Sequence, residues 1–366
     1  MKRVALILGL AIAALFVFGH PVRWTTAALL MSDIAASGEL SFFKRLTAAP
    51  VEATSTLRNI DVDVYTPVNG PRASLVLVPG AAVMGREEPR LRNLARSLAR
   101  ARFLVIVPEL PGPRHLSLSR ADADVLADVL RGANANRPWL PSGIAAVSYG
   151  VGPAIIASLE PDLLGKVDFI VGIGGYHNAD SVIQFTVTGA FRRANDPLLH
   201  RMAPSSYTRW LFLHANASRL DDERDRDLLR ALADRRLDDS GSSSADIRAQ
   251  LSPEGLAVLD LLETTDPAQV PARIAALPEP VRRDIDSLNL ALHDLKPLTA
   301  RLILVHGRDD PVIPYSESEA LAAAARPGAA RLFLIDHIGH VGFRSVTLSN
   351  AWTVWRAVDA LLAERR

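Results

Sequence analysis

The sequence predicts an α/β protein with a mostly parallel β-sheet, helices on both faces of the sheet, and a helical cap inserted between sheet strands. Two observations lead to this fold class. Short apolar runs, typical of strands buried on both faces, alternate with stretches of helical periodicity. Residues 176–297 then contain no convincing strand and are rich in charged, helical segments. The expected buried strands span residues 74–78, 103–107, 143–147, 167–173, 301–306 and 331–335.

Flanking segments complete the expected elements. Residues 59–65 alternate apolar and polar side chains, as a half-exposed strand does. Residues 86–101 carry leucines at helical spacing and arginines elsewhere, which predicts an amphipathic helix with a solvated basic face. Further helices are expected over residues 119–132, 153–159 and 346–364, and within the insertion over residues 219–236, 251–265 and 271–290.

Composition excludes several classes of function. The 366 residues include 41 Lys and Arg against 40 Asp and Glu, a net charge of +1, so there is no electrostatic case for a nucleic-acid partner. Cysteine is absent, which excludes disulfides, thiolate metal sites and a cysteine nucleophile. The length fits one large domain with an insertion, or two domains. The oligomeric state stays open.

The N-terminus has the pattern of a secretory signal. Lys2 and Arg3 precede the apolar run Val4 to Phe18. This run could be a cleaved signal peptide, in which case the protein is secreted, or an uncleaved membrane anchor. No A-x-A cleavage site precedes His20-Pro21, which favours the anchor. Positive residues tend to stay in the cytoplasm, so the body of an anchored protein is expected outside it.

A serine lies where the buried strand at 143–147 runs directly into a helix. A sharp strand-to-helix turn crowds its own backbone, and the residues around Ser148 are small: Ala146, Gly150 and Gly152. This is the steric logic of the G-x-S-x-G nucleophile elbow, with Ala146 at the first glycine position. A serine that merely caps the helix is the alternative interpretation.

The order of later residues favours the elbow. The strand at 301–306 releases Asp309 and Asp310 into a loop, and the strand at 331–335 is followed by His337 and His340. Serine, acid and histidine in this order, each beyond the C-terminal end of a strand, make the chain resemble the α/β-hydrolase-fold superfamily, of the serine esterase or lipase kind, over roughly residues 55–365 apart from the cap.

The resemblance selects one residue of each pair. Gly307-Arg308-Asp309-Asp310, followed by Ile313-Pro314, matches the family's acid loop with Asp310 as the acid. Gly339-His340, followed by Phe343, matches its histidine loop with His340 as the base. Asp309 is expected to cap its loop or to face solvent, and His306 to be a satisfied structural residue.

The resemblance also implies an oxyanion hole. One amide comes from the residue after the nucleophile, Tyr149, and the other from the loop after the strand at 74–78. In that loop Pro79-Gly80-Ala81 occupies the place where many members carry His-Gly-x, so the N–H of Ala81 is the second expected donor, with Ala82 as its neighbour.

These expectations combine into a serine hydrolase that cleaves an ester, or less readily an amide, through a covalent acyl-enzyme. Its substrate is a small-molecule or lipid acyl compound, and neither a cofactor nor a metal is expected, because dinucleotide and phosphate-loop motifs are absent and the histidines are scattered. The alternatives are a membrane-tethered acyltransferase on an envelope lipid or glycan, and a non-catalytic binding protein. The expected organisation is a signal or anchor (1–23), a connector (24–54), a catalytic domain (55–175 and 298–366) and a helical cap (176–297).

Overall fold

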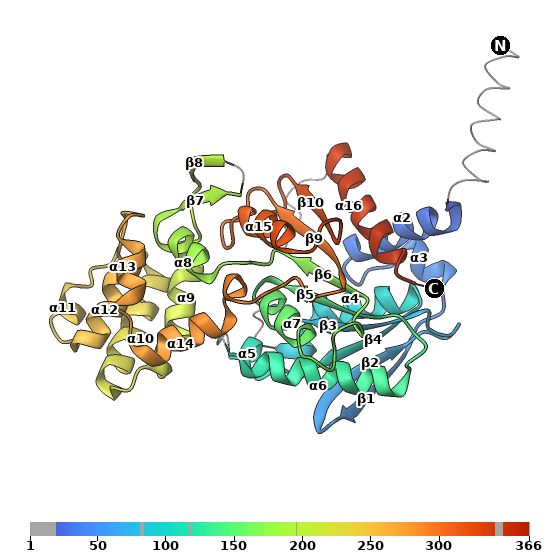
Figure 1. Cartoon of the computed structure of the whole chain (residues 1–366), viewed down its shortest axis with the longest axis horizontal. Coiled ribbons are helices and arrows are strands. Elements are labelled where there is room, and N and C mark those ends of the chain that lie inside the picture. Colours follow the sequence, from blue (N-terminus) through green and yellow to red (C-terminus); the bar gives the residue numbers. More distant parts are fainter. Residues whose placement is uncertain are drawn as a thin grey trace, which may run out of the picture.

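The computed structural model describes residues 20–80, 84–115, 117, 119–194, 196–340 and 347–365. It confirms a mostly parallel sheet, with eight strands in the order β1-β2-β4-β3-β5-β6-β9-β10 (Figure 1). β1 and β2 are antiparallel to each other, β2 is antiparallel to β4, and all later neighbours are parallel. The strands are β1 (Val51–Leu57), β2 (Ile60–Thr66), β3 (Ala73–Val78), β4 (Phe103–Pro108), β5 (Ser142–Val147), β6 (Phe169–Ile173), β9 (Arg301–Gly307) and β10 (Ala330–Ile335).

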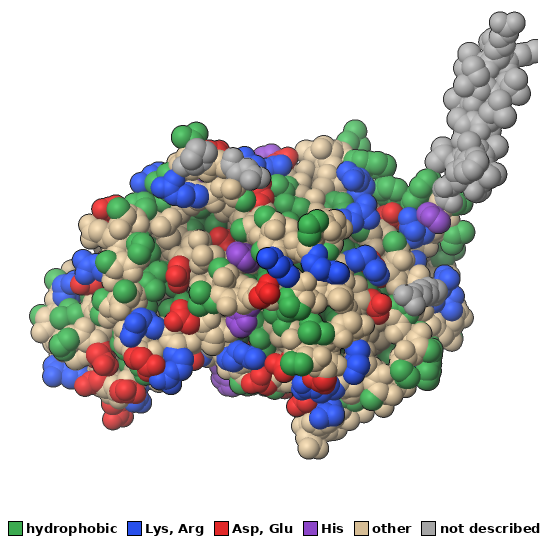
Figure 2. All heavy atoms as spheres, viewed as in Figure 1, with side chains coloured by type: hydrophobic (Ala, Val, Ile, Leu, Met, Phe, Trp, Pro, Cys, Tyr) green, Lys and Arg blue, Asp and Glu red, His purple; other side chains and the backbone are tan. Residues whose placement is uncertain are grey.

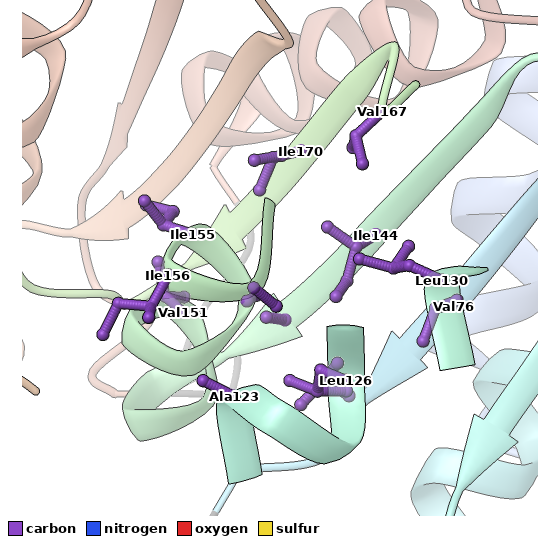
Figure 3. Packing of buried hydrophobic residues seen from close by; sticks show 14 of the residues in the cluster. Val76, Ala123, Leu126, Leu130, Ile144, Val151, Ile155, Ile156, Val167 and Ile170 are labelled. Carbon is purple, nitrogen blue, oxygen red and sulfur yellow. The ribbon is translucent and has the colours of Figure 1, made fainter. Parts of the chain in front are cut away.

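Helices cover both faces of the sheet. On one face α6 (Ala121–Asn136) and α7 (Val151–Ser158) pack their apolar side chains against β3, β5 and β6, as Figure 3 shows for Leu126, Leu130 and Ile155. On the other face lie α2 (Pro21–Ala35), α4 (Pro89–Arg100) and α16 (Leu348–Leu362). Strands buried on both faces need apolar residues at every position, which explains the uninterrupted apolar runs of the sequence.

The insertion between β6 and β9 is mainly helical and lies to one side of the sheet (Figure 1). It also contains an antiparallel hairpin, β7 (Ala190–Arg193) and β8 (Asp196–Arg201), where the sequence predicted no strand. The domain boundaries proposed from the sequence stay a prediction. The helices of the insertion are α8 (Ala179–Thr188), α9 (Ser206–Asn216), α10 (Glu223–Asp238), α11 (Ala245–Arg248), α12 (Pro253–Leu262), α13 (Val270–Ala275) and α14 (Glu279–Leu288).

The segment predicted as a connector is packed onto the body. α2 lies against α16 and α4, α3 (Phe42–Leu46) follows it, and Ala27, Leu30 and Phe43 are buried in the core of that face. The apolar run at residues 4–18 lies outside the described residues. Within the part of the chain that the structure describes, no helix combines the length and the apolar character needed to cross a membrane.

Candidate active site

The turn between β5 and α7 holds Ser148 in a strained conformation. Its φ is +54°, in the left-handed region that residues other than glycine rarely adopt and that costs on the order of 1–3 kcal/mol. A Cβ at Gly150 would lie 2.9 Å from the carbonyl oxygen of Pro79, so a side chain at this position would collide with the loop after β3. The small residues around Ser148 therefore allow a turn that pushes its hydroxyl out beyond the sheet.

Ser148, His340 and Asp310 form one hydrogen-bonded chain. Nε2 of His340 lies 2.8 Å from Oγ of Ser148, and Nδ1 of His340 lies 2.7 Å from Oδ2 of Asp310. Because a carboxylate only accepts, Nδ1 carries the proton in this pair, which leaves the lone pair of Nε2 facing the serine hydroxyl. The structure thus brings together the three residues that the sequence singled out, in the geometry that a serine nucleophile and its base require.

Asp310 is held as a buried carboxylate. Its Oδ1 accepts hydrogen bonds from the amides of Val312 at 2.8 Å and Ile313 at 3.1 Å. Burial alone would raise its pKa, but hydrogen bonds and charge from His306 and His340 outweigh burial and bring the pKa to about 2. The group is therefore ionised at neutral pH and can stabilise an imidazolium.

His306 takes part in this arrangement, which the sequence did not indicate. Its ring is fully buried, with Nδ1 2.7 Å from Oγ of Ser318 and Nε2 2.9 Å from the carbonyl oxygen of Ile313. Nε2 also lies 3.3 Å from Oδ2 of Asp310. His306 is the satisfied structural residue that was expected, and in addition it supports the acid. Its position four residues before Asp310 is the only sequence signal for that contact.

Of the two rejected candidates, Asp309 supports the histidine loop and His337 lies at its start. Oδ1 of Asp309 accepts a hydrogen bond of 3.1 Å from the amide of Gly339 and so fastens the loop that carries His340. His337 adopts a positive φ of +60° at the start of that loop. A Cβ at Gly307 would lie 2.3 Å from the carbonyl oxygen of Gly339, so glycine is required where the acid loop and the histidine loop touch.

Of the two predicted oxyanion donors, Tyr149 lies among the described residues. Tyr149 directly follows the nucleophile at the first turn of the helix, and a Cβ at Gly80 would lie 3.5 Å from Cβ of Ser148, so the loop after β3 approaches the serine. Ala81 and its neighbour Ala82 lie outside the described residues. The two proposed donors, Ala81 and Tyr149, stay predictions.

The Tyr149 side chain belongs to a buried network that sequence reasoning missed. Its hydroxyl donates to Oδ2 of Asp122 at 2.8 Å and accepts from the amide of Ser119 at 2.8 Å. The other oxygen of Asp122 accepts from the amide of Gly112 at 3.1 Å. Burial and the nearby Asp122 raise the pKa of Tyr149, and burial raises the pKa of Asp122. This network holds the side chain of Tyr149, the residue that follows the nucleophile, in a fixed position.

Across the residues that the structure describes, no three His, Asp or Glu side chains gather so that they could hold a metal ion. No family model and no curated protein matches the sequence.

The α/β-hydrolase fold is defined here by the strand order and by a nucleophile turn with a positive φ at Ser148. A serine, an acid and a histidine follow the fifth, seventh and eighth sheet strands, as that fold requires. Solved structures of this kind are similar to the chain. One is a putative hydrolase from Legionella pneumophila, with 16% identity over 87% of this chain and 89% of that chain and a TM-score of 0.49. Another is an α/β-hydrolase superfamily protein from Enterococcus faecalis, with 17% identity over 87% and 100% and a TM-score of 0.48. A third is a meta-cleavage product hydrolase from Pseudomonas fluorescens, with 19% identity over 85% and 98% and a TM-score of 0.43.

Proposed function

We propose that this protein is a serine hydrolase that cleaves carboxylic esters through a covalent acyl-enzyme. Oγ of Ser148 attacks the ester carbonyl carbon while Nε2 of His340 takes the hydroxyl proton. The tetrahedral intermediate collapses, the C–O bond to the alcohol breaks, and His340 returns the proton to the departing oxygen. Water then attacks the acyl-enzyme with His340 as base, which releases the acid and restores Ser148.

The observation that carries this proposal is the continuous hydrogen-bonded chain from Ser148 through His340 to a buried, ionised Asp310. A serine hydroxyl is a weak nucleophile until a positioned base takes its proton. Asp310 holds the imidazole in the required tautomer and stabilises the imidazolium without being protonated itself. In this proposal the amides of Ala81 and Tyr149 stabilise the oxyanion, a contribution of about 2.7–4 kcal/mol for each donor.

A cavity at Ser148 disfavours the non-catalytic alternative. It has a volume of about 280 Å³ and is lined by Ser148 together with cap residues. A binding protein whose catalytic site had lapsed would have no need for an aligned triad at the mouth of such a cavity. An ester is favoured over an amide because an alkoxide is a far better leaving group than an unprotonated amide nitrogen, so ester cleavage depends less on protonation by His340.

Labelling with a fluorophosphonate probe tests the proposal, because the probe reacts with a serine that its histidine has activated. The full chain should be labelled, and Ser148→Ala should not be. Ser158→Ala is the matched control, because Ser158 is a buried serine on α7, the helix that follows the nucleophile turn, and its hydroxyl donates to the carbonyl of Ala154. Loss of labelling in Ser158→Ala as well, or an unlabelled wild type, would contradict the assignment of Ser148.

A further inference from the structure

The cavity beside Ser148 is built almost entirely by the cap. Its walls come from α8, α9, α12 and α14, closed on the body side by Tyr149, Tyr176 and the acid loop. α12 packs on α10 and α13, and Figure 1 places it on the side of the cap away from the sheet. The cavity therefore runs from the nucleophile outward into the cap. Its apolar lining includes Val182, Ile183, Phe212, Leu213, Val258 and Leu261.

The two largest polar side chains on the cavity wall away from the ion pair, Tyr176 and Arg209, are occupied by protein partners. The hydroxyl of Tyr176 donates to the carbonyl of Leu288 at 3.0 Å. Arg209 donates to the backbone carbonyls of Thr186, Val187 and Leu262 at 2.7–3.2 Å.

The remaining charges of the lining neutralise each other. Arg219 forms an ion pair with Asp284 and donates to Oγ of Ser117 at 2.9 Å. A polar ligand group buried here would lose water without gaining a comparable partner, which costs free energy. Because the rest of the lining is mainly apolar, the cavity suits a hydrocarbon bound beside Ser148.

We propose that the cavity binds a hydrocarbon acyl chain of roughly eight to ten carbons, an inference that rests on the proposed ester hydrolysis. At about 30 Å³ for each methylene-sized group, the volume of one water in the liquid, 280 Å³ holds roughly nine such groups. The acyl group stays attached to Ser148 through both half-reactions, whereas the alcohol leaves and water replaces it. An apolar cavity beside the nucleophile suits the part that stays.

A series of p-nitrophenyl esters from acetate to laurate tests this, because the alcohol is constant and only the acyl chain grows. kcat/KM should rise about threefold to fourfold for each methylene up to roughly eight to ten carbons and then level off or fall. A profile that is flat, or that falls from acetate onward, in a protein that the fluorophosphonate still labels would overturn the acyl-chain inference and leave the proposed function standing. Absence of both labelling and turnover would remove the proposed function itself.

A variant in the far wall sharpens the test. Val258 on α12 lines the cavity and packs against two apolar clusters of the cap. Val258→Phe should fill its far end and lower kcat/KM at least tenfold more for the octanoate ester than for the acetate ester. The matched control is Val68→Phe, at a position 58% exposed after β2, which should keep the wild-type profile. If Val258→Phe lowers kcat/KM equally for both esters, or for neither, the acyl chain of the substrate does not reach α12.

A separate observation concerns the face made by α2 and α16. Three of the five tryptophans form one stack there. Trp24 meets Trp355 edge-on at 6.1 Å between ring centroids, and Trp352 stacks on Trp355 at 4.7 Å. The indole N–H of Trp355 donates to the carbonyl of Trp24 at 3.1 Å. Trp352 is nevertheless 59% exposed, so the stack ends in solvent.

Other apolar side chains extend this face. Val22 and Leu348 are 81% and 92% exposed at the first turns of α2 and α16. α3, which packs on α2, exposes Phe42 and Leu46, and hydrophobic side chains gather over α16 and α2 in Figure 2.

We infer that this face lies against the surface of a lipid bilayer. α2 begins at Pro21, directly after the Lys-Arg start and the apolar run Val4 to Phe18, so a membrane that holds that run would meet α2 and α16 first. Indole rings favour the membrane interface, where an apolar body and a polar tip are both accommodated. The inference rests on the prediction that the run enters a membrane.

Tryptophan quenching by brominated phosphatidylcholine in vesicles carrying the full chain tests this contact. Brominated lipid should quench the emission, and Trp352→Phe should remove at least half of the quenched component. Trp139→Phe is the matched control, because Trp139 is 72% exposed on the turn before β5, and it should leave the quenching unchanged. Two results would overturn the contact: quenching equal in Trp352→Phe and wild type, or an unquenched wild type, as expected if a second copy covered the face.

Discussion

Glu317 is a buried carboxyl group whose replacement by glutamine should stabilise the protein at alkaline pH. It lies at the start of α15 (Ser316–Ala324), is 4% exposed, and accepts hydrogen bonds from the amides of His177 at 3.0 Å and Asn178 at 2.7 Å. Burial raises its pKa from 4.5 to about 7, although the two amide hydrogen bonds oppose the rise. Glutamine keeps an oxygen to accept from both amides and cannot ionise.

The direction of the pH dependence of stability follows from the protons that Glu317 binds in the folded and unfolded states. Between pH 4.5 and 7 the folded protein holds a proton at Glu317 that the unfolded chain has released, so the free energy of unfolding falls as pH rises. From pH 5 to pH 8 this loss amounts to about 2.5 kcal/mol for a shift of this size, at about 1.36 kcal/mol for each pKa unit. Glu317→Gln should therefore gain about 2.5 kcal/mol on wild type over that interval.

Chemical denaturation of both proteins at pH 5 and pH 8 measures this difference, because all other titrating groups cancel between them. Glu279→Gln is a control at a carboxyl group whose pKa is lowered, not raised, by its surroundings. Glu279 is an exposed carboxylate paired with Arg283, which lowers its pKa, so its removal should bring no gain at alkaline pH. A difference between Glu317→Gln and wild type that is the same at pH 5 and pH 8 would refute a raised pKa at Glu317.

Three further substitutions probe the site. Asp310→Asn should lower kcat/KM for a p-nitrophenyl ester about 10⁴-fold with folding retained by circular dichroism, because an amide favours the wrong tautomer of His340; a drop under tenfold contradicts this role. Tyr149→Phe should lower the free energy of unfolding by about 1–3 kcal/mol in urea, because Asp122 loses a buried partner; an unchanged value would show that the network adds no stability. Gly150→Val should abolish fluorophosphonate labelling through its collision with the loop after β3, and undiminished labelling would contradict that turn geometry.

The triad could be predicted from sequence because each member follows a buried strand in a fixed chain order. Strand periodicity and the small residues around Ser148 locate the nucleophile turn and the two later loops. The choice of Asp310 over Asp309, and of His340 over His337, came from the resemblance to α/β-hydrolases. The supporting contacts could not be predicted, because they depend on side chains that folding brings together from separate elements. Tyr149 reaches Asp122, 27 positions earlier in the chain, and nothing near either residue signals the pair.

In the fold, too, features set by local sequence could be predicted, and features that depend on tertiary contacts could not. Buried strands were visible as apolar runs, whereas β1 was missed because its residues are exposed and its pairing with β2 depends on backbone hydrogen bonds. The hairpin β7–β8 was missed because its strands are short and carry charged residues. Helices α2 and α3 lie where a connector was expected, since Ala27, Leu30 and Phe43 become buried only against α4 and α16.

The central claim, a covalent acyl group on Ser148, is tested most directly by product partitioning. Two esters of one acid, with p-nitrophenol and with phenol as leaving groups, are hydrolysed in the same mixture of water and methanol, with Ser148→Ala as the inactive control. Both substrates give the same acyl-enzyme once the leaving group has departed, so the ratio of methyl ester to free acid should be the same for both. Ratios that differ with the leaving group, or turnover that persists in Ser148→Ala, would contradict covalent catalysis at this serine.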